Sequence, residues 1–150
     1  MRRVAFPVAT VMLIAIGALE ASVSAQQLAE TVGRPRLESA GVTLTAAGVL
    51  ASTLVYLALG YVAPSDRAAV RTGAMTGALA GLFGGAVRAL IIGDAVGGLV
   101  ARYADVPGWF VPAALAVFVV LSCGASAAAG GAIAWTGRRL SRAARSRRPA

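Results

Sequence analysis

The chain has 150 residues, of which 58% are hydrophobic and only 13% are charged, and its mean hydropathy is +0.77. That balance excludes a water-soluble domain of ordinary composition, in which about 25% of residues are charged. The basic residues are all arginine, histidine is absent, and the formal net charge is +8. The single cysteine excludes both an internal disulfide and a metal or redox cluster built from cysteine and histidine.

Long uncharged runs in the sequence indicate membrane-crossing helices. About 20 apolar residues in a helix cross the roughly 30 Å hydrocarbon core of a bilayer. In lipid, the backbone polar groups must be satisfied within the protein, so such runs form helices unless they belong to a closed barrel. The runs here are continuous and do not alternate with polar residues, which argues against a barrel. We therefore expect an all-α membrane protein, an antiparallel bundle of three or four transmembrane helices.

The first segment, residues 1–25, fits two interpretations. A pair of arginines precedes an apolar run over residues 4–19, and small residues then lead up to Ala25, which is the layout of a cleavable secretory signal peptide. The same residues also suit a first transmembrane span that stays in the mature protein. Residues 26–39 are polar and mixed in charge, and we expect them to form a short exposed extracytoplasmic segment.

The remaining sequence predicts a membrane bundle over residues 40–137, followed by a basic tail at 138–150. The uncharged or nearly uncharged runs within the bundle place its three spans at about 40–62, 72–100 and 109–135. We expect these spans to form a compact antiparallel bundle in which the last two helices pack tightly over glycine and alanine.

The distribution of arginine predicts the orientation of the chain. Short cytoplasmic loops carry an excess of arginine over loops on the other side. With the N-terminus inside, ten arginines fall in the inner segments and three in the outer segments, where acidic residues accompany them. The C-terminus is cytoplasmic whether or not the first segment is removed. We expect a multi-pass protein of a bacterial inner (plasma) membrane.

Glycine recurs at every fourth position in the predicted span at 72–100, which is the third helix if the first segment is retained. These glycines form a stripe along one side of a helix, because four residues turn a helix by about 400°. Small residues let membrane helices approach closely, so that van der Waals contact drives their association. The spacing therefore predicts a glycine-zipper-like seam, within the chain or between copies of it. The residues expected at helix contacts are Gly73, Gly77, Gly81, Gly85 and Gly93, with Gly124 and Gly131 on the last span.

Arg88 and Asp94 are charged residues within the predicted span at 72–100. Intramembrane charges are costly, and by default they mark a functional site. Two alternatives remain for Arg88: it extends to the outer headgroups, or it is buried in an ion pair or contacts a substrate. If the first span is retained, Glu20 lies at nearly the same depth as Arg88 and would pair with it.

The basic tail contains six arginines and no acidic residue. Next to the cytoplasmic end of a span, such a tail is expected to contact anionic lipid headgroups, at about 1 kcal/mol per arginine. Nucleic acid is not an expected partner, because no folded reader or base-stacking aromatic accompanies the arginines. The six residues are Arg138, Arg139, Arg142, Arg145, Arg147 and Arg148.

Residue patterns typical of catalysis are missing from the sequence. There is no histidine, no clustered carboxylate pair, no phosphate-binding loop ending in lysine and no nucleophile elbow. We therefore expect no enzyme, no cofactor and no metal. The expected function is a scaffold or accessory subunit that packs through small residues, in a homo-oligomer or a larger membrane complex. The alternative is an oligomeric pore or small transporter with an anion path near Arg88.

Overall fold

The computed structural model of the chain describes residues 7–19, 39–103 and 106–146, and these residues form four helices. The prediction of an all-helical protein is confirmed for this part of the chain. The helices are an N-terminal helix (Pro7–Leu19), α2 (Ser39–Val62), α3 (Asp66–Tyr103) and α4 (Phe110–Ser146).

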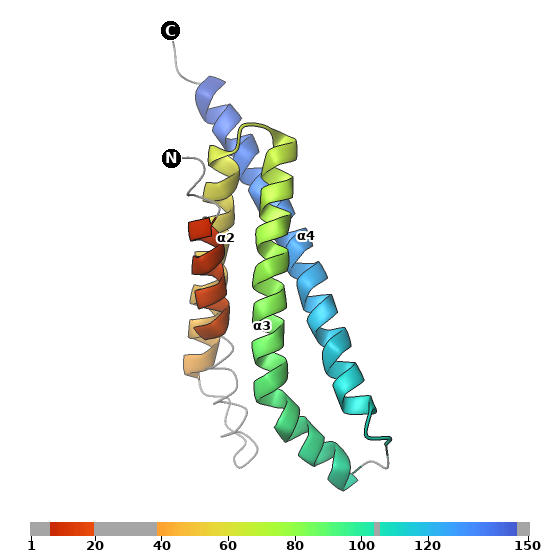
Figure 1. The fold of residues 1–150 in the computed structure, drawn as a ribbon. Coiled ribbons are helices and arrows are strands. Elements are labelled where there is room, and N and C mark those ends of the chain that lie inside the picture. Colours follow the sequence, from red (N-terminus) through yellow and green to blue (C-terminus); the bar gives the residue numbers. More distant parts are fainter. Residues whose placement is uncertain (1–6, 20–38, 104–105, 147–150) are drawn as a thin grey trace.

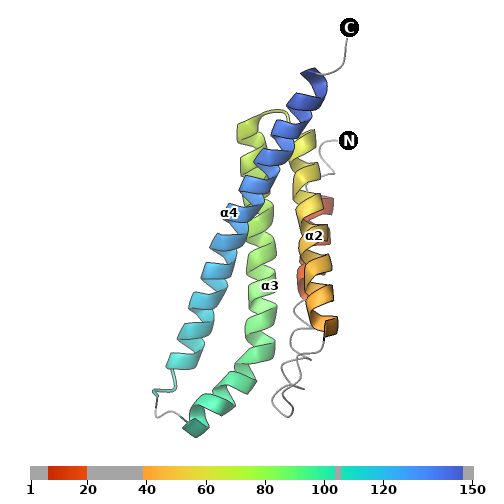
Figure 2. The same ribbon diagram turned by 180° about the vertical axis from the view of Figure 1, so that it is seen from behind.

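Neighbouring helices run in opposite directions along the bundle (Figure 1). The N-terminal helix lies against α2, and a tight turn after α2 returns the chain along α3. Seen from the other side, α4 crosses the α2–α3 hairpin obliquely (Figure 2). The contact between α3 and α4 is the most extensive, that between α2 and α4 is smaller, and that between α2 and α3 is slight. Therefore α4 is the helix that holds the hairpin together.

The turn between α2 and α3 is fixed by local hydrogen bonds. The N–H of Ala63 donates to the carbonyl of Gly60 at 3.2 Å, which closes the end of α2. Pro64 restricts the residue before it to non-helical conformations, so α2 ends here. The hydroxyl of Ser65 then accepts a hydrogen bond from the N–H of Ala68 at 3.2 Å and caps α3.

Both long helices extend beyond the predicted spans. α3 has 38 residues and α4 has 37, which correspond to about 57 Å and about 55 Å. The spans predicted at 72–100 and 109–135 are shorter because hydropathy marks only the apolar part of a helix. Backbone hydrogen bonds continue into the polar flanks, and α4 runs without a break through Gly137 and the basic tail as far as Ser146.

Two of the helices are long and apolar enough to cross a membrane. Their apolar segments are Asp66–Ile91, with a hydropathy of 1.5, and Phe110–Ser146, with a hydropathy of 2.1. None of the most apolar stretch of α4 is buried within the fold, and only 22% of that of α3 is. Large apolar side chains such as Leu90, Val120 and Leu121 point outward and are 66–77% exposed. The fold therefore presents its apolar side chains to its surroundings.

A small apolar core joins the N-terminal helix to α2. Ala9 and Leu13 are buried against Tyr56 and Leu59, and Leu13 is only 3% exposed. Val55, Ala80 and Ile133 pack around this cluster, so α3 and α4 also contribute to it. The N-terminal helix therefore packs as part of the bundle in this structure.

Candidate functional site

The four glycines spaced four residues apart on α3 face α4. A Cβ atom at Gly73 or Gly77 would overlap the backbone carbonyl of Gly130 or Ser126, respectively. A Cβ at Gly81 would lie 2.6 Å from the carbonyl oxygen of Ser122, a separation that real Cβ atoms essentially never show. Gly85 is at the looser end of the contact. Glycine at these positions therefore allows the two backbones to approach closely.

The facing surface of α4 also repeats every four residues, and it was not among the predicted contact surfaces. Ser122, Ser126, Gly130 and Ala134 lie opposite the α3 glycines in an antiparallel register. Four-residue spacing of small side chains is visible in the sequence and is the pattern that locates this surface. Serine within a span also bonds back to its own helix, so the two serines of the stripe do not mark a helix contact by themselves.

The same stretch of α4 also contacts α2. A Cβ atom at Gly60 would overlap the backbone of Ala134, and one at Gly137 would overlap that of Leu57. On the adjoining turn, a Cβ at Gly130 would lie 2.8 Å from the Tyr56 ring. Neither Gly60 nor Gly137 was among the predicted packing residues. α4 therefore uses Gly130–Gly137 as a junction that touches both helices of the hairpin.

The other predicted packing glycines differ in their surroundings. A Cβ at Gly93 would lie 3.2 Å from Leu115, and one at Gly131 would lie 3.5 Å from the Cβ of Ala74. A Cβ at Gly124 would meet nothing within 4 Å, so this residue lies outside the α3–α4 contact. The glycine contact is thus present in the fold, whereas its action as a zipper within a membrane stays a prediction.

Polar side chains lie inside the helix contacts. Thr76 is fully buried, and its hydroxyl has no hydrogen-bond partner in the described part of the chain. The thiol of Cys123 donates to the carbonyl oxygen of Ala78 at 3.4 Å, from α4 to α3. These groups, together with Ser122 and Ser126, place small and polar residues in the contact between α3 and α4.

Arg138 is buried where α4 passes the α2–α3 turn, and it is 9% exposed. Its Nη2 donates to the carbonyl oxygen of Pro64 at 2.8 Å, and its Nη1 donates to the hydroxyl of Ser141 at 3.2 Å. That hydroxyl in turn donates to the backbone carbonyl of Arg138 at 2.8 Å. In this structure the side chain fixes the turn, and the expected contact of Arg138 with anionic lipid headgroups stays a prediction.

Asp66, the first residue of α3, joins the same cluster. Its Oδ1 lies 2.5 Å from Nη2 of Arg142 and 3.9 Å from Nε of Arg138. We name the group formed by Pro64, Asp66, Arg138, Ser141 and Arg142 the turn clamp. The local sequence around Asp66 indicates only a turn, and no local pattern links this residue to side chains more than 70 positions later.

The other tail arginines are placed differently from the turn clamp. The guanidinium of Arg139 lies over the ring of Trp135, 4.5 Å from its centroid, which is a cation–π arrangement. Arg145 is exposed in the last turn of α4. Arg147 and Arg148 lie outside the described residues. Contact of Arg139, Arg142 and Arg145 with anionic headgroups stays a prediction.

The candidate intramembrane charges lie far along α3 from the turn clamp. Arg88 is half-buried, and its side chain is not free of interactions. Asp94 lies on α3, but its side chain is outside the described set, and Glu20 is outside the described residues. The predicted pairing of Glu20 with Arg88 stays a prediction.

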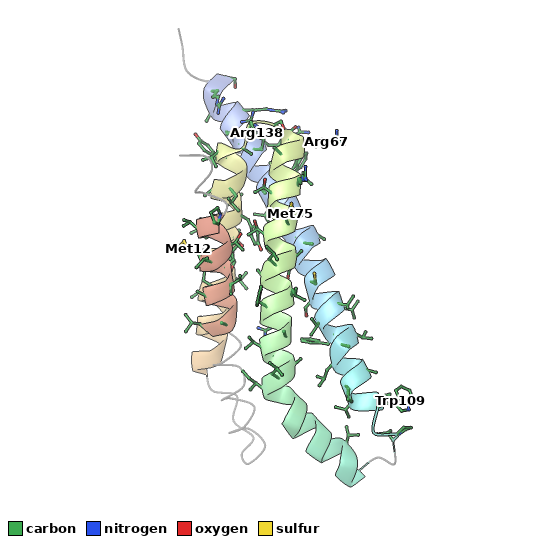
Figure 3. All side chains as sticks on the ribbon, viewed as in Figure 1. Met12, Arg67, Met75, Trp109 and Arg138 are labelled. Carbon is green, nitrogen blue, oxygen red and sulfur yellow. The ribbon has the colours of Figure 1, made fainter. Side chains whose placement is uncertain are left out.

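Two open grooves flank the first half of α3. One, of about 510 Å³, lies between α3 and α4 and is lined by small apolar residues with Trp135. The other, of about 560 Å³, is lined by Ser65, Arg67, Ala68, Arg71, Thr72 and Met75. Arg88 lines neither groove. Figure 3 shows Arg67 and Arg138 at the turn end of the bundle, with Trp109 at the opposite end.

Within residues 7–19, 39–103 and 106–146, no group of three or more histidine, cysteine or acidic residues could hold a metal ion. What the arrangement can do chemically is pack helices, fix a turn and present guanidinium groups. Comparison with known proteins found no matching family model, no similar curated protein and no similar solved structure.

Proposed function

We propose that the chain is a multi-pass integral membrane protein without catalytic activity, which acts as a scaffold or accessory subunit. The observation that carries this proposal is that many large apolar side chains are exposed while polar side chains are buried, which is the reverse of the arrangement in a water-soluble protein. Large apolar residues of α4 such as Leu121 are 66% exposed, whereas Thr76 and Ser141 are fully buried. Exposed apolar surface on this scale is costly in water. In a bilayer the same surface faces hydrocarbon at no such cost.

The scaffold role has the better support of the two functions considered. Helix contacts made by glycine backbones are short and leave little room for water, which suits a rigid structural unit. A transporter with an anion path near Arg88 needs a water-filled space beside that residue, and neither groove extends to it. A pore formed between copies of the chain would be detected by a flux measurement.

The turn clamp and the tail lie at one end of the bundle, which we place on the cytoplasmic side of a bacterial inner membrane. The excess of arginine in these segments supports that orientation. In this placement Arg139 and Arg145 lie at the level of anionic headgroups, and the start of α4 at Phe110 lies on the opposite side.

Cysteine labelling tests the membrane placement, because the chain has one natural cysteine that can be removed as Cys123→Ser. Single cysteines are then introduced as Leu121→Cys, Gly108→Cys and Ser146→Cys, all at positions exposed in the fold. A membrane-impermeant maleimide applied to whole cells with a permeable outer barrier should label the Gly108→Cys variant. The Ser146→Cys variant should react only after the inner membrane is opened. The Leu121→Cys variant should stay unlabelled until the protein is unfolded.

Each labelling result decides one part of the proposal. Rapid labelling of the Leu121→Cys variant in opened cells would show water around α4 and would reject membrane insertion. Labelling of the Gly108→Cys and Ser146→Cys variants from the same side would reject a span between them.

The scaffold role itself predicts association. The protein extracted from native membranes in a mild detergent should elute with a protein mass well above the 15.0 kDa of one chain. A mass equal to one chain would contradict both the accessory-subunit and the homo-oligomer forms of the proposal.

A further inference from the structure

The groove lined by Arg67 and Arg71 is distinct from the tail and from the turn clamp. We propose that it binds the headgroup of an anionic phospholipid of the cytoplasmic leaflet, with the phosphate held between the two guanidinium groups. This inference rests on the membrane placement proposed above. The groove has a volume of about 560 Å³, which lies within the usual range of about 300–1,000 Å³ for ligand sites.

The positive charge of the groove is uncompensated. Arg67 and Arg71 are both exposed, and within the described part of the chain neither makes a hydrogen bond or an ion pair. The adjacent carboxylate of Asp66 would be the natural counter-charge, but it bonds to α4 through Arg142. The turn clamp therefore engages Asp66 and leaves the two guanidinium groups of the groove available to a ligand.

The groove also lies at the start of α3. The positive end of the helix dipole lies in the first turn, and it adds to the attraction for an anion there. Arginine presents donors in a planar fork that matches phosphate oxygens. The hydroxyl of Thr72 also lines the groove. These features favour a phosphate group over a cation or a neutral sugar.

The direction of the groove along α3 distinguishes a lipid from free phosphate. Arg67, Arg71 and Met75 are spaced four residues apart, so they follow one side of α3. Figure 3 shows Met75 further along the helix than Arg67, toward the middle of the bundle, and its side chain is 49% exposed. Charge at the membrane surface followed by an apolar residue deeper along the helix matches the headgroup and acyl chain of a phospholipid.

The test uses the full chain purified in a neutral detergent and native mass spectrometry with phosphatidylglycerol or phosphatidylcholine. The wild-type protein should bind its first phosphatidylglycerol more tightly than phosphatidylcholine. The double variant Arg67→Gln/Arg71→Gln should bind phosphatidylglycerol about 30-fold more weakly. The double variant Arg67→Lys/Arg71→Lys should recover part of that loss, because it keeps the charge and loses the fork.

The matched control is the double variant Arg139→Gln/Arg145→Gln, which removes the same charge from exposed positions on the tail. It should weaken binding of the first phosphatidylglycerol clearly less than the groove variant does, because the tail contact is spread over several arginines. An equal loss of phosphatidylglycerol affinity in the control would show that the lipid is attracted by the positive charge of the whole cytoplasmic end. That result fits the proposed tail contact but overturns the groove site. Unchanged affinity in the groove variant would also overturn it. So would displacement of the lipid by inorganic phosphate at an equal concentration, or a preference for an acidic peptide over the lipid.

Membrane insertion is measured on the same variants. This measurement distinguishes rejection of the lipid site in the groove from rejection of the proposed membrane placement. All variants should remain in membranes after an alkaline carbonate wash. A wild-type protein released by this wash would reject the membrane placement itself, whereas retained variants with unchanged lipid affinity would reject only the groove.

Discussion

Nη2 of Arg142 lies 2.5 Å from Oδ1 of Asp66, a residue 76 positions earlier in the chain. This ion pair joins the last part of α4 to the first turn of α3, on top of the buried hydrogen bond from Arg138 to Pro64. The negative charge of an acidic residue in the first turn also stabilises α3, because it interacts favourably with the positive end of the helix dipole. Asp66 therefore has two roles, in starting α3 and in holding α4 against the turn.

The two arginines of the turn clamp should differ in their contributions to stability. Arg138 is buried and bonds to a backbone carbonyl, so Arg138→Gln should lower the free energy of unfolding by about 2–3 kcal/mol. The side chain of Arg142 is 53% exposed, and Arg142→Gln should cost less than about 1 kcal/mol. Denaturant unfolding in detergent, followed by circular dichroism, measures both. Arg145→Gln is the control and should have no effect; a larger effect for Arg142 than for Arg138 would contradict the assignment.

Two glycines of α3 should respond to alanine substitution with changes in stability of opposite sign. A Cβ at Gly77 would overlap the backbone of Ser126, whereas a Cβ at Gly84 would meet nothing within 4 Å. Gly77→Ala should therefore destabilise the fold by about 1–3 kcal/mol. Gly84→Ala should leave stability unchanged or raise it by up to about 1 kcal/mol, because alanine favours helix. Thermal unfolding of the two variants in one detergent compares them, and equal shifts would show that the glycine contact does not set stability.

The helices could be predicted from the sequence because apolar runs identify them directly. The predicted span at 40–62 lies close to α2, which begins at Ser39 and ends at Val62. The ends of α3 and α4 could not be placed, because backbone hydrogen bonding does not stop where hydropathy falls. The α3 half of the helix contact could also be predicted, since glycine at four-residue steps leaves one side of a helix open to a close neighbour.

The rest of the candidate site depends on how the helices cross. Gly60 and Gly137 become contact residues only because α4 crosses α2 at Ala134 and Leu57. The burial of Arg138 follows from the same crossing. The residues next to it in the sequence give no indication of burial, because they are those expected of an exposed tail. A run of arginines carries no mark that separates the buried member from Arg139, which is one residue away and exposed. Such residues are found only once the arrangement of helices is known.

The packing of the N-terminal helix predicts that residues 7–19 stay in the mature protein. Leu13 is 3% exposed, whereas its neighbour Met12 is 51% exposed. If this helix belongs to the bundle, Leu13→Ala should destabilise the protein by about 2 kcal/mol or more, and Met12→Ala should have little effect. The intact mass of the protein purified from membranes gives the direct check. A mature N-terminus at Gln26 would show that the helix is removed and that this packing is lost.

Arg88 separates the scaffold from the transporter by a flux measurement. The side chain is half-buried, is not free of interactions, and lines neither groove beside α3. We therefore expect liposomes that contain the wild-type chain to release chloride or phosphate no faster than protein-free liposomes. An ionophore added at the end verifies that the vesicles were sealed. Anion release that is lost in Arg88→Ala and kept in Arg145→Ala would reject the scaffold in favour of a transporter or pore.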